Sequence, residues 1–229
     1  LSGPGRLRFG GVRDFLLGIS FVDGHGELIQ GGGKVVKNAA GFDFPKLMVG
    51  AMGSLGILVD LTFKVFPAPE AAATLKLELG SFKEAVDTMT TLASGSYELS
   101  SLELEPPSTL WLRLSGFAEA LPIRLMVLQE DIGKSGQSFQ DQSDSDIWQQ
   151  AREFSWVPAD YGLVKIPTNP SKLSAIEKRV SELTVHVPRR YSVAGNVAYF
   201  AWPKVLGEET LRRLLTPDAL SAVALRGTW

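Results

Sequence analysis

The amino-acid sequence predicts an α+β fold in which a small glycine-rich part is followed by a larger antiparallel part. Branched apolar residues fill positions 57–65, as is typical of a buried strand. From residue 70 onward, strand-like and helix-like periods alternate in two β-α-β-β-α passes, which favour an antiparallel sheet with helices on one face. Pro67-Ala68-Pro69 predicts a boundary between a domain at residues 1–69 and a domain at residues 70–229.

The first part is expected to contain one small sheet and one short helix. A hairpin turn at Asp23-Gly24-His25-Gly26 joins two of the strands. Pro45 predicts the start of the helix, because the first turn of a helix does not need the N–H that proline lacks. The extended segments are predicted at residues 6–9, 13–21, 27–30 and 57–66.

The second part begins with an alternating strand and a well-marked helix. Ser81-Phe82-Lys83-Glu84 has the pattern of a capping box. The buried face of the helix that follows is predicted to be Phe82, Ala85, Val86, Met89 and Leu92. Residues 133–145 are rich in Gln, Ser and Asp and are expected to form a flexible loop. Strands are predicted at 74–79, 97–105, 110–114, 163–167, 185–191 and 196–202, with further helices at 117–132, 147–154, 170–183 and 208–215.

Length and composition narrow the possible functions. The chain has 229 residues, of which 45% are hydrophobic and 21% charged, so it can bury a substantial core. A net charge of −2 and a pI near 5.8 give no basic field for nucleic acid or an anionic membrane. The absence of cysteine excludes disulfides, thiolate catalysis and cysteine-bound metal clusters within the chain. Charged residues interrupt the most apolar run, at 42–66, so no transmembrane segment is expected.

The first residues have the composition of a loop, and the chain does not begin with Met, so we expect a fragment of a longer protein. Its chemistry is expected to centre on the glycine-rich stretch at residues 31–59. The three consecutive glycines at 31–33 permit positive φ and close approach of the backbone to another group. Lys37 and Asn38 either lie near a cofactor or, with equal weight, extend into solvent and hold a turn.

Gly50, Gly53 and Gly56 have a spacing that could be taken for a dinucleotide fingerprint. That motif needs a strand before the glycines and a helix after them, so that the pyrophosphate meets the helix N-terminus. In this sequence the helix comes first and the strand second, so we reject a Rossmann site.

Several short motifs within residues 1–69 resemble one known family. They are Arg8-Phe9-Gly10-Gly11-Val12-Arg13-Asp14, Leu17-Gly18, Lys37-Asn38, Gly41-Phe42-Asp43, Leu47, Val49-Gly50, Gly53-Ser54-Leu55-Gly56-Ile57 and Lys64-Val65-Phe66-Pro67. This stretch resembles the flavin domain of the vanillyl-alcohol oxidase (PCMH-type) superfamily, and within it the FAD-binding subunit of bacterial glycolate oxidase (GlcE type). Phe42 stands where the family usually has Tyr. The upstream glycine-rich loop of the family and its Asn-Pro-Gly ending have no counterpart in this sequence.

The resemblance implies the C-terminal half of a PCMH-type FAD-binding domain, followed by a ferredoxin-like antiparallel cap domain. It implies FAD as the cofactor, held at its pyrophosphate by a loop near the start of the chain and along its length by backbone. The implied cofactor-binding residues are Ser2, Gly3, Pro4, Gly10, Lys37, Asn38, Gly53, Ser54, Gly56 and Ile57. The alternative is that these glycines only permit tight turns.

The resemblance also implies a function, that of the FAD-binding subunit of a glycolate oxidase or 2-hydroxy-acid dehydrogenase complex. The implied partners are a second flavin subunit, an iron–sulfur subunit and a small 2-hydroxy acid. The implied location is the cytoplasm, at the inner membrane through the partner subunits. Two alternatives stay open: a truncated, non-catalytic subunit that serves as an assembly module without flavin, and an oxidase of another substrate in the same superfamily.

The sequence indicates no catalytic residue. A basic cluster late in the chain could bind a carboxylate, because Arg binds carboxylates bidentately, but a solvated strand face is favoured there. The cluster is His186, Arg189, Arg190 and Tyr191. His25 lies at the hairpin turn, and neither histidine is accompanied by a group of carboxylates, so no metal site is expected.

Overall fold

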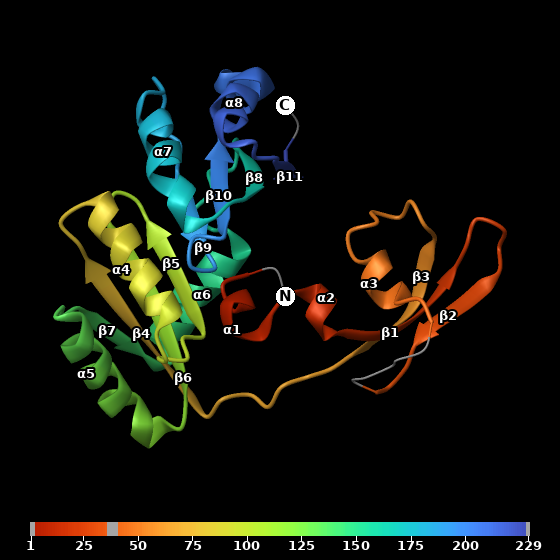
Figure 1. Ribbon diagram of the computed structural model, residues 1–229, viewed down its shortest axis with the longest axis horizontal. Coiled ribbons are helices and arrows are strands. Elements are labelled where there is room, and N and C mark those ends of the chain that lie inside the picture. The colour runs from red at the N-terminus through yellow and green to blue at the C-terminus, as the bar shows by residue number, and fades with distance from the viewer. Residues whose placement is uncertain (1–2, 36–40, 228–229) are drawn as a thin grey trace. The chain divides into compact units, whose positions relative to one another are not determined.

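The computed structural model describes residues 3–35 and 41–227, which form two compact units (Figure 1). One unit comprises residues 9–68, and the other comprises residues 69–227 together with residues 3–8. In the described ranges, no helix is long and apolar enough to cross a membrane.

The segment that links the start of the chain to the first unit is helical, not extended as predicted. Helix α1 (Arg6–Phe9) is a single turn. It is closed by the carbonyl of Gly3, which accepts a hydrogen bond of 3.0 Å from the N–H of Arg6, and by Pro4, which accepts from Leu7. A proline before the turn is compatible with helix, because its missing N–H is not needed there.

The first unit is a three-stranded antiparallel sheet with the strand order β2–β1–β3. Phe21 on the central strand lies opposite Ile29 on one side and Leu58 on the other. The predicted hairpin and the helix at Pro45 are confirmed. The elements are α2 (Val12–Phe15), β1 (Leu16–Val22), β2 (Leu28–Gly32), α3 (Phe44–Met48) and β3 (Ile57–Phe63).

The central strand begins three residues later than predicted. Residues 12–15 form a helical turn instead, because the carboxylate of Asp14 accepts a hydrogen bond of 2.7 Å from the N–H of Gly11. An acidic side chain in this position satisfies a donor that the turn cannot satisfy itself.

Helix α3 packs on the sheet because two glycines leave room for it. Asp43 caps the helix by accepting a hydrogen bond of 3.2 Å from the N–H of Lys46. A Cβ atom at Gly31 would lie 2.7 Å from the Cβ of Phe44, and one at Gly32 would collide with the carbonyl of Leu17. The close approach predicted for the glycine run is therefore an approach to this helix. The core beneath it consists of Leu16, Ile19, Phe21 and Met48.

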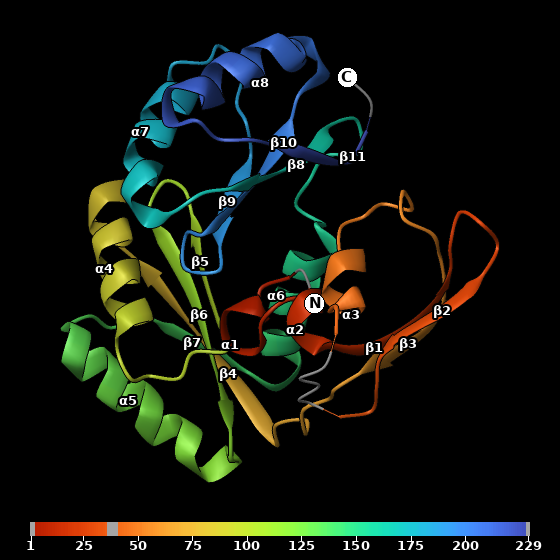
Figure 2. The ribbon, with the colours of Figure 1, turned by 45° about the vertical axis from the view of Figure 1, so that its right-hand side comes forward.

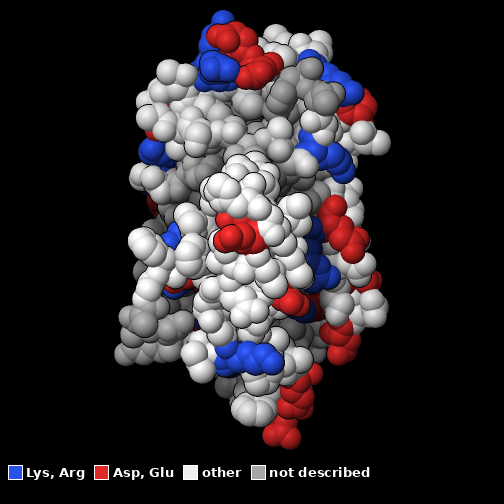
Figure 3. All heavy atoms as spheres, turned by 90° about the vertical axis from the view of Figure 1, so that its right-hand side faces the viewer, with Lys and Arg blue, Asp and Glu red and all other residues white. Residues whose placement is uncertain are grey.

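Strand β3 is present as predicted, but it is not buried. All but one of its residues are exposed, with Ile57 at 74% and Val59 at 57%. Branched apolar residues fit the pleated backbone whether or not another layer covers them, so their pattern identifies a strand and not its neighbours. The face of the molecule in Figure 3 has wide uncharged areas between its charged side chains.

The second unit contains an antiparallel sheet of eight strands in the order β11–β8–β10–β9–β5–β6–β4–β7. The strands are β4 (Ala71–Glu78), β5 (Ser101–Glu105), β6 (Thr109–Gly116), β7 (Gln137–Gln140), β8 (Gly162–Pro167), β9 (Arg189–Ser192), β10 (Val197–Trp202) and β11 (Val223–Arg226). The helices are α4 (Phe82–Ser94), α5 (Leu121–Ile132), α6 (Asp141–Glu153), α7 (Pro170–Ser181) and α8 (Gly207–Leu215), with short 3-10 turns at Ala118–Ala120, Lys204–Leu206 and Thr216–Asp218.

The eight-stranded sheet consists of two ferredoxin-like halves. The first half runs β4-α4-β5-β6-α5-β7 and the second runs β8-α7-β9-β10-α8-β11. In each half the strands lie in the order fourth, first, third, second. The equivalent strands β5 and β9 join the halves in antiparallel pairing, with Leu104 opposite Tyr191. The two predicted passes are confirmed, and each gains a fourth strand that the sequence did not indicate.

Helices α4, α5, α7 and α8 cover one face of this sheet (Figure 2). The predicted face of α4 is confirmed, since Ala85, Val86, Met89 and Leu92 are buried. The hydroxyl of Ser81 accepts a hydrogen bond from the N–H of Glu84 at 3.1 Å. The carboxylate of Glu84 accepts from the N–H of Gly80 at 2.9 Å, one residue before the position that the capping box predicts.

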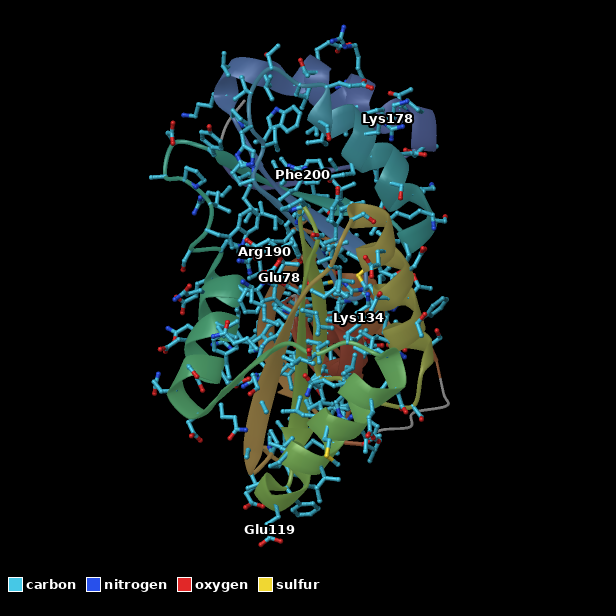
Figure 4. All side chains as sticks on the ribbon, turned by 90° about the vertical axis from the view of Figure 1, so that its left-hand side faces the viewer. Glu78, Glu119, Lys134, Lys178, Arg190 and Phe200 are labelled. Atoms are coloured by element: carbon cyan, nitrogen blue, oxygen red, sulfur yellow. The ribbon has the colours of Figure 1, made fainter. Side chains whose placement is uncertain are left out.

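The stretch 133–145 is not the flexible loop that its polar composition predicted. It contains β7, which pairs with β4, and the first residues of α6. Helix α6 lies on the sheet face opposite α4 and α5 (Figure 4), so the prediction of helices on one face is also wrong. The side chain of Asp144 on α6 is almost fully buried and hydrogen-bonds to Thr74 on β4. Polar residues pack in this place because each finds a polar partner.

Candidate functional site

The glycine-rich loop between α3 and β3 has exposed backbone. Gly50 and Gly53 have φ values of +88° and +80°. The N–H of Ser54 donates to the carbonyl of Ala51 at 2.9 Å, and the hydroxyl of Ser54 donates to the same oxygen at 2.6 Å. The loop is therefore held by its own hydrogen bonds, and its shape requires glycine at two positions.

The glycines of this loop have two different roles. A Cβ atom added at Gly50 or Gly53 would meet no other atom within 4 Å, so the backbone there faces open space. A Cβ atom at Gly56 would lie 2.5 Å from the carbonyl oxygen of Val22, so Gly56 is needed for the pairing of β3 with β1. All three glycines have positive φ and so have a conformational role, and Gly50 and Gly53 in addition present bare backbone.

Exposed apolar side chains lie in this loop and directly after it. Met52 is 88% exposed, Leu55 is 44% exposed and Ile57 is 74% exposed. Bare peptide groups beside apolar surface are suited to a flat, partly polar ligand such as a flavin, because peptide groups can hydrogen-bond its polar edge. The residues present at this loop thus fit FAD.

The remaining residues implied by the resemblance lie elsewhere. Gly3 and Pro4 pack with the second unit, and Pro4 is buried. Gly10 has a φ of +83° and adjoins the side chain of Asp14, which caps α2. Ser2, Lys37 and Asn38 lie outside the described residues.

The basic cluster predicted late in the chain does not form one site. Arg189 and Tyr191 both bind Glu177, through contacts of 2.8 Å from Nε and from the hydroxyl. Arg190 lies on the other face of the sheet, while His186 is exposed. The favoured interpretation as a solvated face is also wrong, because Tyr191 is fully buried. Successive residues of a strand point to opposite faces, which separates these side chains.

A charged group that the sequence did not single out lies at the seam between the two halves. Glu103 on β5 is 4% exposed and accepts a hydrogen bond of 2.7 Å from the hydroxyl of Ser192. Arg190 reaches it at 3.8 Å and reaches Glu105 at 3.4 Å. Burial raises the pKa of Glu103, although Ser192 and Arg190 oppose this. The alternation of residues 102–104 places Glu103 on the face opposite Leu102 and Leu104, where a solvated carboxylate is expected, so the sequence gives no sign of its burial.

Comparison by structure defines the class of fold. The chain is similar to an alkyldihydroxyacetonephosphate synthase with a TM-score of 0.68 and 12% sequence identity, over 96% of this chain and 51% of that one. Another crystal form of that enzyme gives a TM-score of 0.66. This confirms the predicted fold class, an α+β chain of the PCMH-type flavoprotein fold with antiparallel sheets. No family model matches the chain.

Comparison by sequence identifies particular relatives. The chain is 32% identical to glycolate oxidase subunit GlcE of Escherichia coli (strain K12) over 182 residues, which are 74% of this chain and 46% of that protein. Glycolate oxidase subunit GlcD of Bacillus subtilis (strain 168) is 33% identical over 105 residues, which are 45% of this chain and 22% of GlcD. The D-2-hydroxyglutarate dehydrogenase of Xanthomonas citri pv. viticola is 38% identical over 76 residues, 33% of this chain and 16% of that enzyme.

These relatives confirm the resemblance to the GlcE type that the motifs indicated. The match to GlcE is longer than the first 69 residues that carry the motifs, so it extends into the second unit. The chain spans less than half the length of each of these curated relatives.

Proposed function

We propose that this chain is the FAD-holding part of a complex that oxidises a small 2-hydroxy acid, of the glycolate oxidase kind. The observation that carries the proposal is the similarity to GlcE, which includes residues of both units. The names of the other relatives, GlcD and D-2-hydroxyglutarate dehydrogenase, also refer to 2-hydroxy acids. An assembly module without flavin is not favoured, because the loop at residues 49–57 keeps bare backbone beside apolar surface.

In this proposal, the loop supplies the cofactor contacts of the first unit. The peptide groups at Gly50 and Gly53 would bind polar atoms of FAD, and Ile57 would lie against its apolar surface. FAD, when bound, supplies the acceptor for a hydride equivalent from the α-carbon of the hydroxy acid. The role of this chain is to hold and orient the cofactor and to exclude water from it.

The proposal includes partner subunits, namely a second flavin subunit and an iron–sulfur subunit. The names of GlcE and GlcD support a complex of several subunits. The exposed apolar residues of β3 support the presence of another protein subunit that covers this strand, because large apolar patches on a protein surface commonly mark contacts between proteins. We place the complex in the cytoplasm, at the inner membrane through its partners.

The visible absorption spectrum of the purified chain, with and without added FAD, tests this proposal. We expect a bound-flavin spectrum that bleaches when glycolate or D-lactate is added without oxygen.

Gly53→Ala should weaken FAD binding about tenfold, because the added methyl group holds the ligand off the backbone. Gly133→Ala is the matched control, since Gly133 also has a positive φ and open space around it but lies in the second unit.

Two results would overturn the proposal. One is a chain that stays colourless with FAD both alone and when co-expressed with a second flavin subunit. The other is a bound flavin that no 2-hydroxy acid reduces, which would leave an oxidase of another substrate.

A further inference from the structure

Helix α5 carries apolar side chains on its outer side as well as on the side that packs on the sheet. The buried side chains are Leu121, Leu125 and Leu128. On the outer side, Ile123 is 61% exposed, Met126 is 56% exposed and Val127 is 43% exposed. Residues three and four positions apart share a face of a helix, so these three form one apolar stripe. The outer face of a surface helix is normally polar.

The second half of the eight-stranded sheet shows that the fold does not require this stripe. Helix α8 takes the same place in that half as α5 takes in the first. The exposed residues of α8 are Glu208, Glu209, Arg212 and Arg213, all of them charged. Because the equivalent helix is polar on its outer side, the stripe on α5 is better explained by a partner that covers it.

A pocket of about 250 Å³ adjoins the stripe, between α5 and the segment that follows α4. Ile123 and Val127 form one wall and Tyr97 lies in the other. Arg124 ties the two walls together, since its guanidinium donates to the carbonyl of Tyr97 at 2.9 Å and to a carbonyl on β6 at 3.0 Å. Small-molecule sites usually have volumes of about 300–1,000 Å³. This pocket therefore suits a single large apolar side chain better than a whole cofactor.

The side chains around the stripe that remain available to a partner are acidic. Glu98 and Asp131 line the pocket, and Glu130 continues the stripe toward the end of the helix. Glu119, just before α5, points away from the second unit (Figure 4). Within the described ranges, neither Glu119 nor Glu130 has an ion pair.

The cations beside the pocket are already engaged. Arg124 is held by the two carbonyls, and Arg8 donates to the carbonyl of Glu98 at 2.9 Å. Both arginines approach the carboxylate of Glu98 only to 3.9 Å, and that side chain stays 66% exposed. Lys134, which follows α5, is paired with Glu84. The surface is thus complementary to a positively charged partner and would repel an anionic membrane.

We propose that the stripe and its pocket bind an amphipathic helix of another protein. One large apolar side chain of that helix fills the pocket, and its Lys and Arg residues lie against Glu98, Glu130 and Asp131. A helix suits the stripe because side chains at three- and four-residue spacing pack beside a row with the same spacing. That the other protein is a further subunit of a complex for 2-hydroxy acids rests on the proposed function, but the surface itself does not.

Fluorescence anisotropy of a labelled synthetic helix, titrated with the whole chain, tests this surface. The helix is made of Leu and Lys, with Leu at three- and four-residue spacing, and the control helix has Glu in place of each Lys. We expect the Lys helix to bind saturably and the Glu helix to bind at least about tenfold more weakly. The difference should shrink as salt is added, because salt screens exposed charges.

Substitutions separate the apolar part of the surface from the acidic part. Val127→Gln should weaken binding of the Lys helix about tenfold, because it places an amide in the wall of the pocket. Glu130→Gln should weaken it less and should lower its dependence on salt. Val205→Gln is the matched control, since this valine is 79% exposed on a 3-10 turn of the other half, and it should leave binding unchanged. All three positions are exposed, so unchanged thermal unfolding is expected in each variant.

Equal binding of the Lys and Glu helices, or unchanged binding in Val127→Gln, would overturn the proposal. So would binding to vesicles of phosphatidylglycerol that is lost in Val127→Gln, because the surface would then belong to a membrane. Self-association that is lost in Val127→Gln but not in Val205→Gln would assign the surface to a second copy of this chain and would also overturn it. If the Lys helix binds as expected but the chain stays colourless with FAD, the proposed function fails and the surface stands.

Discussion

The hydroxyl of Thr74 donates a hydrogen bond of 2.6 Å to the carboxylate of Asp144, and both side chains are buried. Arg113 donates to the same carboxylate through Nε at 3.1 Å, and the indole N–H of Trp148 donates to the Thr74 hydroxyl at 2.6 Å. This network attaches α6 to the sheet face opposite the other helices. It explains why a polar stretch of the chain is ordered.

Asp144→Ala should destabilise the second unit by about 3 kcal/mol, because it leaves Arg113 and the Thr74 hydroxyl without their acceptor. Urea unfolding followed by tryptophan fluorescence measures this change, since Trp111, Trp148, Trp156 and Trp202 all lie in this unit. Asp146→Ala on the exposed side of α6 is the control and should change stability little. Equal effects of the two substitutions would contradict the role of the network.

Glu103→Gln should stabilise the second unit at neutral pH. Burial raises the pKa of Glu103 above its usual 4.5, so the folded chain binds this proton more tightly than the unfolded chain does. Its contribution to stability is present below pH 4.5 and is lost as the pH rises toward the raised pKa. The amide removes that loss and can still accept the hydrogen bond from Ser192.

Thermal unfolding of the two proteins between pH 4 and pH 8, followed by tryptophan fluorescence, checks the sign of this effect. The advantage of Glu103→Gln should grow as the pH rises. An advantage that is the same at every pH would show that the carboxylate does not titrate differently in the folded chain. Glu182→Gln, at an exposed glutamate after α7, controls for the general loss of a negative charge.

Gly56→Ala should destabilise the first unit by about 2 kcal/mol or more, because the new Cβ atom would press on the carbonyl of Val22. Hydrogen–deuterium exchange of the peptides from β1 measures it, with faster exchange expected in the variant. Gly24→Ala is the control, since Gly24 lies in the hairpin turn with open space around it and no positive φ. Unchanged exchange in Gly56→Ala would show that the strands can separate to admit a methyl group.

Val59→Lys should reduce self-association of the chain, because Val59 is 57% exposed on an apolar strand. Light scattering as a function of protein concentration measures this. Val205→Lys, at a residue that is 79% exposed on a short 3-10 turn of the second unit, adds the same charge without interrupting an apolar strand. If both variants reduce scattering equally, net charge and not β3 controls solubility.

The sequence alone predicted most elements of this protein and their order. Local signals were sufficient where the conformation of a residue depends on its neighbours in the chain. Examples are Pro45 at the start of α3 and Ser81 at the cap of α4. The start of β1 was missed for a local reason, the Asp14 cap. The motifs at residues 1–69 indicated the flavoprotein fold that the comparisons then confirmed.

Tertiary structure alone decided which faces are covered and which side chains meet. The composition of residues 133–145 predicts disorder, but pairing with β4 and the burial of Asp144 order them. The branched residues of β3 predict burial, but no layer covers them within the described chain. Lys165, Tyr199 and Arg190 become neighbours only when three strands take their order in the sheet. Periodicity sets which way a side chain faces along its own strand, whereas its partners are set by contacts between residues far apart in the sequence.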